Sequence, residues 1–485
     1  MMSKPKRLHP IAMLGYMGKR IKSFILPIIA FTFSVTRDSG RPLVYALIVS
    51  FVAAIFIFIT SFVSWLRYTY KLEHDELRIE EGIFVRKKRY IPYERIQSID
   101  FSEGMLQRLF GLVKVQIETA GGSGADEAEA VLSAISKEEA QLIQEYAATA
   151  EGNGTMEVKE VPEGHPIYKI STRQLLILSV TSGGVGVVIS AVLALLSQVD
   201  DLIPFKKLTS GFEKWIASGL LLIAILVFFG LFLAWVIALI GTMLKYANFK
   251  VIKINSDLVI TQGLLEKRQI TIPLKRIQAI RISENMVRQF LGFATVYVES
   301  AGGSSTNQEG SKVTLIPIVK LNQIQSIIEP ELDEYLVPDS FTPLPKRAIW
   351  RYIFRKWYIA VPIVIGSLIF LKTWGLLSII LLGAMTLWAV LKYKSAGWML
   401  TEQQLALRYG AFIRNTVLMK KNKIQSLEIR ESYFQQQREL GTIEAFVKSG
   451  AGGAGGKVID MEKGDIEKIY DWYSRDKEKR DSSEK

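Results

Sequence analysis

The segment GIFVRKKRYIPYERIQSIDFSEGMLQRLFGLVKVQIETAGG, residues 82–122, recurs later in the chain. Shifted by 181 residues without a gap, it falls on residues 263–303, and 16 of the 41 positions are identical. A more divergent third copy begins near Gly410 and retains KIQS at 423–426 and AGG at 451–453. Internal repetition on this scale decides the fold, because each copy must form the same structural unit.

Each copy has the pattern of several short strands followed by a helix. In the first copy, alternation of apolar and polar residues predicts strands at Tyr68–Glu73, Leu77–Glu80, Ile83–Ile91, Ile96–Phe101 and Val113–Thr119. Ser102 is expected to cap a short helix that Gly111 ends. The sequence SKEE at 136–139 forms a capping box that opens an amphipathic helix. The pattern predicts a small antiparallel barrel or sandwich closed by a C-terminal helix.

The motifs IP, RIQ, QRLFG and AGG, in this order in the first copy, resemble the bacterial pleckstrin-homology-like (PH-like) domain of YdbS/YdbT-type membrane proteins. The resemblance covers all three copies and is strongest to the long, three-domain YdbT-like members. It implies a bent antiparallel sheet capped by one helix. It also implies docking of lipids or proteins, no catalytic residues, and a smaller membrane protein with a related PH-like domain as partner.

Apolar runs in pairs precede the three copies, and about 20 apolar residues in a helix cross a bilayer core. The pairs are Phe24–Val35 with Leu43–Leu66, Leu175–Leu196 with Trp215–Leu244, and Tyr358–Leu371 with Trp374–Leu391. The runs at 24–35 and 358–371 are short, so a re-entrant or interfacial placement stays open for them. The pairing favours three transmembrane hairpins, one before each soluble unit.

Lysine and arginine residues cluster where the apolar runs adjoin the soluble blocks, as at Arg67, Lys245 and Lys392. The opposite loops are short and less basic, although Lys206 and Lys207 weaken the contrast. The positive-inside rule then predicts six crossings of a bacterial cell membrane, with both termini and all soluble units in the cytoplasm.

The predicted boundaries alternate membrane and soluble segments. They are a basic N-terminus with hairpin 1 (1–66), PH-like domain 1 (67–150), a linker (151–174), hairpin 2 (175–244), PH-like domain 2 (245–330), a linker (331–357), hairpin 3 (358–391), PH-like domain 3 (392–474) and a charged tail (475–485) expected to be disordered.

Composition excludes several classes of function. The chain has no cysteine and three histidines, which argues against thiol catalysis and against Cys or His metal clusters. The AGG loops lack the lysine and helix start of a phosphate-binding loop, and the apolar runs carry no charged residue for ion transport. The net charge of +13 lies mostly beside apolar runs, which indicates topology signals and anionic lipid rather than nucleic acid. We expect no enzyme activity, cofactor or metal.

The densest basic run is Arg86, Lys87, Lys88 and Arg89, followed at the second copy by Lys267 and Arg268 and at the third by Arg414. These residues are candidates for contact with anionic lipid headgroups. Strand alternation sends Arg86 and Lys88 to one face and Lys87 and Arg89 to the other. A solvated strand edge without a ligand is the alternative interpretation.

Three functions remain open from the sequence. The first is a membrane-anchored scaffold whose three PH-like domains dock protein partners, with homo-oligomerisation as one form of this. The second is binding or sensing of anionic membrane lipids. The third is an accessory role in an exporter or in envelope defence against toxic peptides.

Overall fold

The computed structural model describes residues 5–36, 42–73, 75–83, 85–119, 130–150, 166–182, 220–300, 312–332, 335–449 and 454–483. The AGG motifs at 120–122, 301–303 and 451–453 lie outside the described residues. The same holds for the linker up to residue 165 and for most of the predicted run Leu175–Leu196.

The first unit contains all the elements that the repeat predicts. Its elements are β1 (Lys6–Arg7), α1 (Ala12–Thr36), α2 (Pro42–Arg67), β2 (Thr69–Leu72), β3 (Glu76–Glu81), β4 (Lys87–Pro92), η1 (Tyr93–Arg95), β5 (Ile96–Glu103), α3 (Met105–Leu109), β6 (Leu112–Thr119), β7 (Ala130–Ser136) and α4 (Lys137–Ala150).

The second and third units repeat this order. The second has β8 (Pro166–Lys169), α5 (Thr172–Thr181), α8 (Leu220–Tyr246), β9 (Lys250–Ile254), β10 (Asp257–Gln262), β11 (Lys267–Pro273), η3 (Leu274–Arg276), β12 (Ile277–Asn285), α9 (Met286–Leu291), β13 (Phe293–Ser300), β14 (Lys312–Lys320), η4 (Leu321–Gln323) and α10 (Ile324–Ile328). The third has β15 (Thr342–Pro343), α11 (Ala348–Leu371), η5 (Lys372–Leu377), α12 (Ser378–Ser395), β16 (Gly397–Leu400), β17 (Gln404–Tyr409), β18 (Ile413–Lys420), η6 (Lys421–Lys423), β19 (Ile424–Arg430), α13 (Tyr433–Gln436), β20 (Leu440–Val447), β21 (Ala454–Glu462) and α14 (Lys463–Ser483).

Three local predictions were wrong. The strand expected to begin at Ile83 begins at Lys87, because Gly82 adopts φ = 119° and opens a turn there. Ser102 is not a helix cap: β5 continues through Glu103, and α3 follows Gly104. The charged tail, expected to be disordered, is helical as far as Ser483 as part of α14.

The sheets continue from one unit into the next, which the local sequence pattern does not predict. In one seven-stranded sheet the order is β7-β6-β5-β11-β10-β9-β8, so strands of the first unit pair with strands of the second. The second seven-stranded sheet, β14-β13-β12-β18-β17-β16-β15, joins the second unit to the third in the same way. The remaining sheets are β1-β2-β3-β4 at the start of the chain and β19-β20-β21 at its end.

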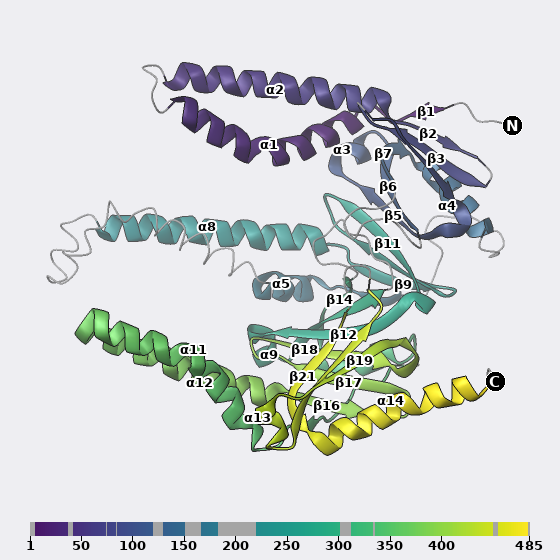
Figure 1. Ribbon diagram of the computed structural model, residues 1–485. Helices are drawn as coiled ribbons and strands as arrows, with labels where there is room; N and C mark the ends of the chain where they lie inside the picture. Colours follow the sequence, from purple (N-terminus) through teal and green to yellow (C-terminus); the bar gives the residue numbers. More distant parts are fainter. Residues whose placement is uncertain are drawn as a thin grey trace.

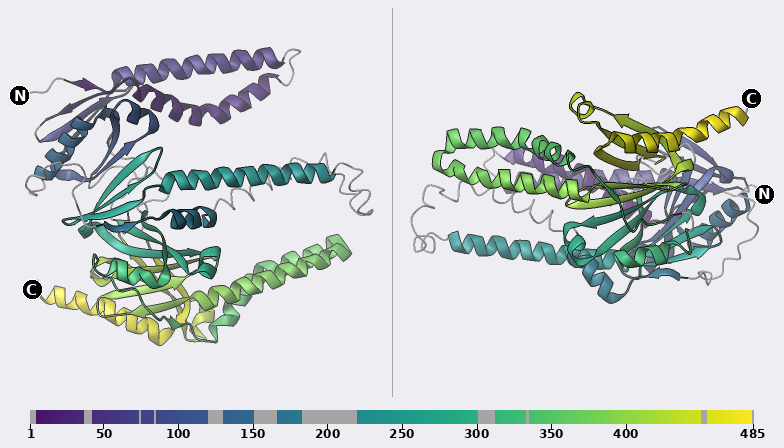
Figure 2. Two further views of the ribbon diagram at one scale, coloured as in Figure 1. Left: turned by 180° about the vertical axis from the view of Figure 1, so that it is seen from behind. Right: turned by 90° about the horizontal axis from the view of Figure 1, so that it is seen from below.

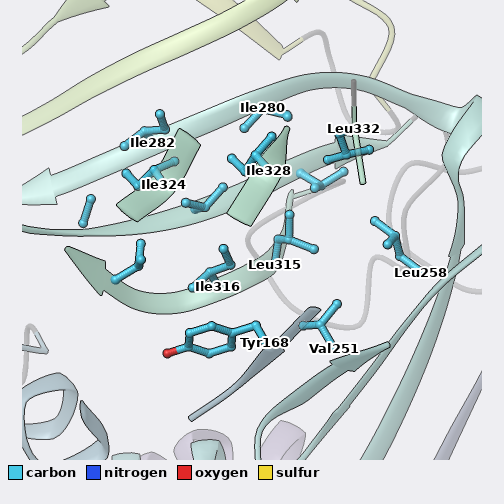
Figure 3. Close-up of a cluster of buried hydrophobic side chains, with 14 of the residues drawn as sticks. Tyr168, Val251, Leu258, Ile280, Ile282, Leu315, Ile316, Ile324, Ile328 and Leu332 are labelled. Atoms are coloured by element: carbon cyan, nitrogen blue, oxygen red, sulfur yellow. The ribbon is translucent and has the colours of Figure 1, made fainter. Parts of the chain in front are cut away.

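At the junction between the second and third units, the hydrophobic cores follow the sheet from one unit into the next. The largest core lies between the strands of the second unit and its C-terminal helix α10, and includes Ile280, Ile282 and Ile324 (Figure 3). It also takes in Leu418 from the third unit, which is 0% exposed. Burial of apolar side chains shared between units stabilises the junction as well as each unit.

The long apolar helices all leave the soluble units on the same side (Figures 1 and 2). Four of them are long and apolar enough to cross a membrane, within the described residues: Val44–Arg67, Phe228–Tyr246, Ala348–Phe370 and Gly375–Ser395. Helices α1 and α2 pack as a hairpin, as do α11 and α12. The protein is therefore a membrane protein with several apolar helices and β-rich soluble units.

The six expected runs map unevenly onto these helices. The run Phe24–Val35 is part of α1, which contains Pro27 and is curved (Figure 1) but is not among the four candidate spans. The short run Tyr358–Leu371 forms the second half of the 24-residue helix α11, which is long enough to span. In the middle unit, α5 ends at Thr181, so the described part does not form the hairpin predicted there.

Candidate docking site

Each soluble unit presents a turn and a short helix at the end that faces its membrane helices (Figure 1). The turns join β3 to β4, β10 to β11 and β17 to β18, and the short helices are α3, α9 and α13. The second-unit turn is held to α8, because the N–H of Leu264 donates to the carbonyl of Leu244 at 2.9 Å. In the third unit, the ring of Phe412 lies 5.5 Å from the ring of Trp388 on α12. The turns of the second and third units therefore lie where the membrane helices join the soluble units.

The short helices α3, α9 and α13, with the residue after α3, expose large apolar side chains. These are Met105, Leu106, Leu109 and Phe110, then Met286, Val287, Phe290 and Leu291, then Tyr433 and Phe434. Phe290 is 84% exposed, although a soluble surface usually shows such residues only singly. Apolar side chains on short elements beside membrane helices are suited to the boundary between lipid headgroups and acyl chains.

The basic run at the start of β4 is paired with acids of β3. Arg86 forms an ion pair with Glu80, and Lys88 lies 3.6 Å from the same carboxylate. Arg89 lies 3.1 Å from Glu81. The hydrogen bond from Arg86 holds the pKa of Glu80 below its usual value. Arg86, which directly precedes β4, and Lys88 thus share one carboxylate.

The corresponding basic residues of the later units lie at the junctions between units. Arg268 lies 3.6 Å from Asp100 of the first unit, and their side chains are 17% and 6% exposed. Lys267 lies directly opposite Glu103 in the β11–β5 pairing. Arg414 donates from both Nε and Nη2 to the carboxylate of Glu284, with Nε at 2.9 Å from Oε1. Basic residues at this position therefore join neighbouring units.

A buried arginine strengthens the second junction. Arg281 forms an ion pair with Glu299 in its own unit. It also donates to the hydroxyl of Tyr409 at 2.7 Å and to the carbonyl of Gly455 at 3.1 Å, both in the third unit. Burial lowers the pKa of Arg281, but Glu299 and Tyr409 outweigh burial and the net pKa is raised. The guanidinium thus stays charged and satisfied between two units.

A second buried network, which sequence reasoning missed, ties a membrane helix to a soluble unit. The carboxylate of Asp460 on β21 is fully buried and accepts from Arg351 at 3.0 Å and from Arg355 at 2.9 Å, both on α11. Gln435 on α13 donates to it at 2.8 Å. The spacing of Arg351 and Arg355, one helical turn apart, is the only sequence signal for this contact.

Within the described residues, no group of three His, Asp or Glu side chains is placed to hold a metal ion. The features that stand out are contacts between units and between units and membrane helices. Docking is therefore the role that these contacts support.

Comparison with known proteins gives a consistent result. The sequence model of the bacterial PH domain family matches residues 23–150, 187–332 and 359–477. The UPF0699 transmembrane protein YdbT of Bacillus subtilis (strain 168) is 39% identical over 500 residues, which cover 98% of this chain and 99% of YdbT. No solved structure matches.

Proposed function

The chain belongs to the bacterial PH domain family, as its repeated motif indicated, and from this premise we propose that it is a non-enzymatic membrane scaffold for protein partners. Its three PH-like units dock partners at the cytoplasmic face of the membrane. The observation that carries this proposal is the pairing of β5 with β11 and of β12 with β18, since the unit binds another unit of its own kind through the edges of its sheets.

The proposed topology has six membrane crossings, with a hairpin for each unit and with both termini in the cytoplasm. The common direction of α2, α8, α11 and α12 supports a single membrane on one side of the stack (Figure 2). Basic residues next to these helices support the cytoplasmic orientation. We propose further that the strands of each unit form a PH-like barrel that is capped by its C-terminal helix, α4, α10 or α14.

Three linked units favour a scaffold because a partner that contacts two of them gains effective concentration without a tight single site. Strand pairing supplies main-chain hydrogen bonds, and the side chains at the edge supply the selectivity. A smaller membrane protein with a related PH-like domain has the right kind of edge to be such a partner.

The scaffold is tested by purifying the protein from its native membrane in mild detergent and identifying bound proteins and lipids by mass spectrometry. A protein partner in stoichiometric amount is the expected result. Enrichment of one anionic lipid without any protein partner would overturn the scaffold in favour of the second candidate.

The second candidate is binding of anionic lipid, and it rests on the exposed apolar side chains of α3, α9 and α13 beside the membrane helices. Lys87, Lys88 and Arg89 lie at the start of β4, and Arg86 directly precedes it. Reconstitution into liposomes with and without anionic lipid separates the candidates. Neutralising the four basic residues lowers lipid co-purification if they bind headgroups and leaves it unchanged if they bind protein.

A further inference from the structure

Both junctions inside the chain use the same pairing step, in which a strand of one unit pairs with a strand of the preceding unit in a fixed register. Four residues after the left-handed glycines Gly82, Gly263 and Gly410, the chain carries Arg86, Lys267 and Arg414. Seven residues after the first residue of β5, β12 and β19, it carries Glu103, Glu284 and Glu431. In the structure Lys267 is opposite Glu103 and Arg414 is opposite Glu284. A basic residue of one unit thus faces an acidic residue of the preceding unit, twice, in one register.

This step leaves one edge open at each end of the stack. Among the described strands, β4 pairs only with β3, and β19 pairs only with β20. Arg86 therefore adjoins an edge that no strand of another described unit covers, and the same is true of Glu431. We propose that the β19 edge of one copy of this chain pairs with the β4 edge of a second copy, by the step that joins the units within a chain. The proposal rests on the scaffold function and names the partner.

The register predicts which residues meet. Arg86 comes opposite Glu431, and Arg89 comes opposite Glu428, as Val417 is opposite Arg281 inside the chain. The diagonal contact between Lys87 and Glu428 would repeat the contact between Arg268 and Asp100. Opposite charges across paired strands stabilise the pairing.

One predicted pair is unfavourable, because Lys87 comes opposite Arg430. Arg430 is already bound to Glu428 within β19, at 2.6 Å. Lysines on an edge strand commonly prevent pairing with arbitrary strands. Here they favour an acidic edge, since the acids Glu428 and Glu431 add opposite charges that a neutral or basic strand does not offer.

Burial distinguishes the open edges from the closed ones. Ile282 and Leu418 are 3% and 0% exposed at the closed junction between the second and third units. The residue equivalent to Ile282 at the end of the stack, Ile429, is 36% exposed. The residue equivalent to Leu418 at its start, Tyr90, is 55% exposed. Pairing of two copies would cover both side chains, and removal of apolar surface from water favours it.

The geometry of the membrane permits this pairing. Each internal step keeps the membrane helices on one side of the stack (Figures 1 and 2), so a copy added by the same step stays in the same membrane. The two edges are different surfaces, which makes the contact head-to-tail. Such contacts produce a ring if the rotation closes and a filament if it does not.

The test uses the absence of native cysteine to place single thiols in the full-length chain. One tagged form carries Lys88→Cys and a differently tagged form carries Ile429→Cys, positions that the register sets opposite each other. The two are co-expressed in one membrane and treated with a short thiol cross-linker. We expect a cross-linked product that carries both tags and little product from either form alone. The matched control is Lys88→Cys with Lys457→Cys, on the far strand of the same sheet, which should not cross-link.

Charge reversal in the same cross-linking pair tests the register. Arg86→Glu in the first form, or Glu431→Arg in the second, should each lower the yield by about fivefold, and the two together should restore it. Gel filtration and thermal melting identify any variant that is misfolded. A second pair of thiols then replaces it: one form carries Tyr90→Cys together with Lys88→Gln, and the other carries Leu427→Cys, which the register sets opposite Tyr90.

The outcomes separate this inference from the scaffold. No product with both tags in well-folded protein, or equal yield at Lys457→Cys, overturns pairing of two copies. Capture of a different protein at Lys88→Cys in native membranes, without the self-product, overturns self-pairing but supports the scaffold. Absence of any protein at either thiol, together with the absence of a co-purified partner, overturns both.

Discussion

Removal of Arg414 provides a sensitive test of the junction between the second and third units. Glu284 is 3% exposed at its side chain and Arg414 is 25% exposed, so Arg414→Ala leaves a buried carboxylate without its charged partner. Loss of one member of a buried pair costs about 3–5 kcal/mol. Because Arg414 is a quarter exposed and water can enter in its place, we expect about 2 kcal/mol.

Hydrogen exchange measured by mass spectrometry on the protein in detergent or nanodiscs reports this loss. If β12 and β18 separate locally, a loss of about 2 kcal/mol accelerates exchange of their shared amides roughly 30-fold. Exchange in β6 and β7 of the first unit should not change. The double variant Glu284→Gln with Arg414→Gln should recover most of the protection, because it removes the unpaired charge.

An exposed ion pair serves as the control. Lys468 lies 3.3 Å from Asp465 on α14 and is 71% exposed, so Lys468→Ala should alter exchange by less than about threefold. If Arg414→Ala has no greater effect than Lys468→Ala, the ion pair does not hold the junction and the reasoning on inter-unit pairing is refuted.

Three further predictions follow from other contacts. Asp460→Ala leaves Arg351 without its buried carboxylate and should destabilise the third unit by about 3 kcal/mol, seen as a lower melting temperature and faster proteolysis near α11. Burial raises the pKa of Glu139, but hydrogen bonds from Lys6 and Tyr70 outweigh it and lower the net pKa. This stabilisation is therefore present above the unfolded value of about 4.3 and is lost as the pH falls through the folded pKa, and Glu139→Gln should weaken the dependence of melting temperature on pH in that range. Gly263→Ala forces φ = 101° on an L-residue and brings its Cβ 1.9 Å from the carbonyl oxygen of Glu266, so it should cost more than 1 kcal/mol in thermal melting, whereas Gly464→Ala, with open space around it, should cost nothing.

The repeat made the soluble units predictable from sequence. The paired strands and the C-terminal helix of each unit depend on local alternation and capping, and in the second unit this helix lies at residues 321–328, in η4 and α10. Ser136 accepts a hydrogen bond from the N–H of Glu139, as its place in the capping box requires. Local physical chemistry determines these features, so local sequence is enough to find them.

The membrane helices were predicted less completely. Hydropathy located α2 and α8, but it placed the start of α11 about ten residues late, because Arg351, Arg355 and Lys356 lie in its first turns. Two of these charges are satisfied by Asp460, which is more than 100 residues away in the sequence. An apolarity criterion cannot recognise a charged helical turn that docks on a soluble unit.

The pairing between units was the least predictable feature, because β5 and β11 are about 170 residues apart and each also has the pattern of an ordinary strand. A basic residue at a strand edge suits a lipid headgroup and a carboxylate of a neighbouring strand equally well, so the sequence makes Lys267 and Arg268 candidates for lipid contact, with a solvated strand edge as the alternative. The distinguishing signal is a correspondence between copies. A glutamate in one copy, Glu103 or Glu284, lies opposite a basic residue of the next copy. Arg86 in the first unit is the basic residue of this correspondence, and Glu431 in the third unit is the acidic residue. The sequences of the two end units therefore contain the same signal that the internal junctions use.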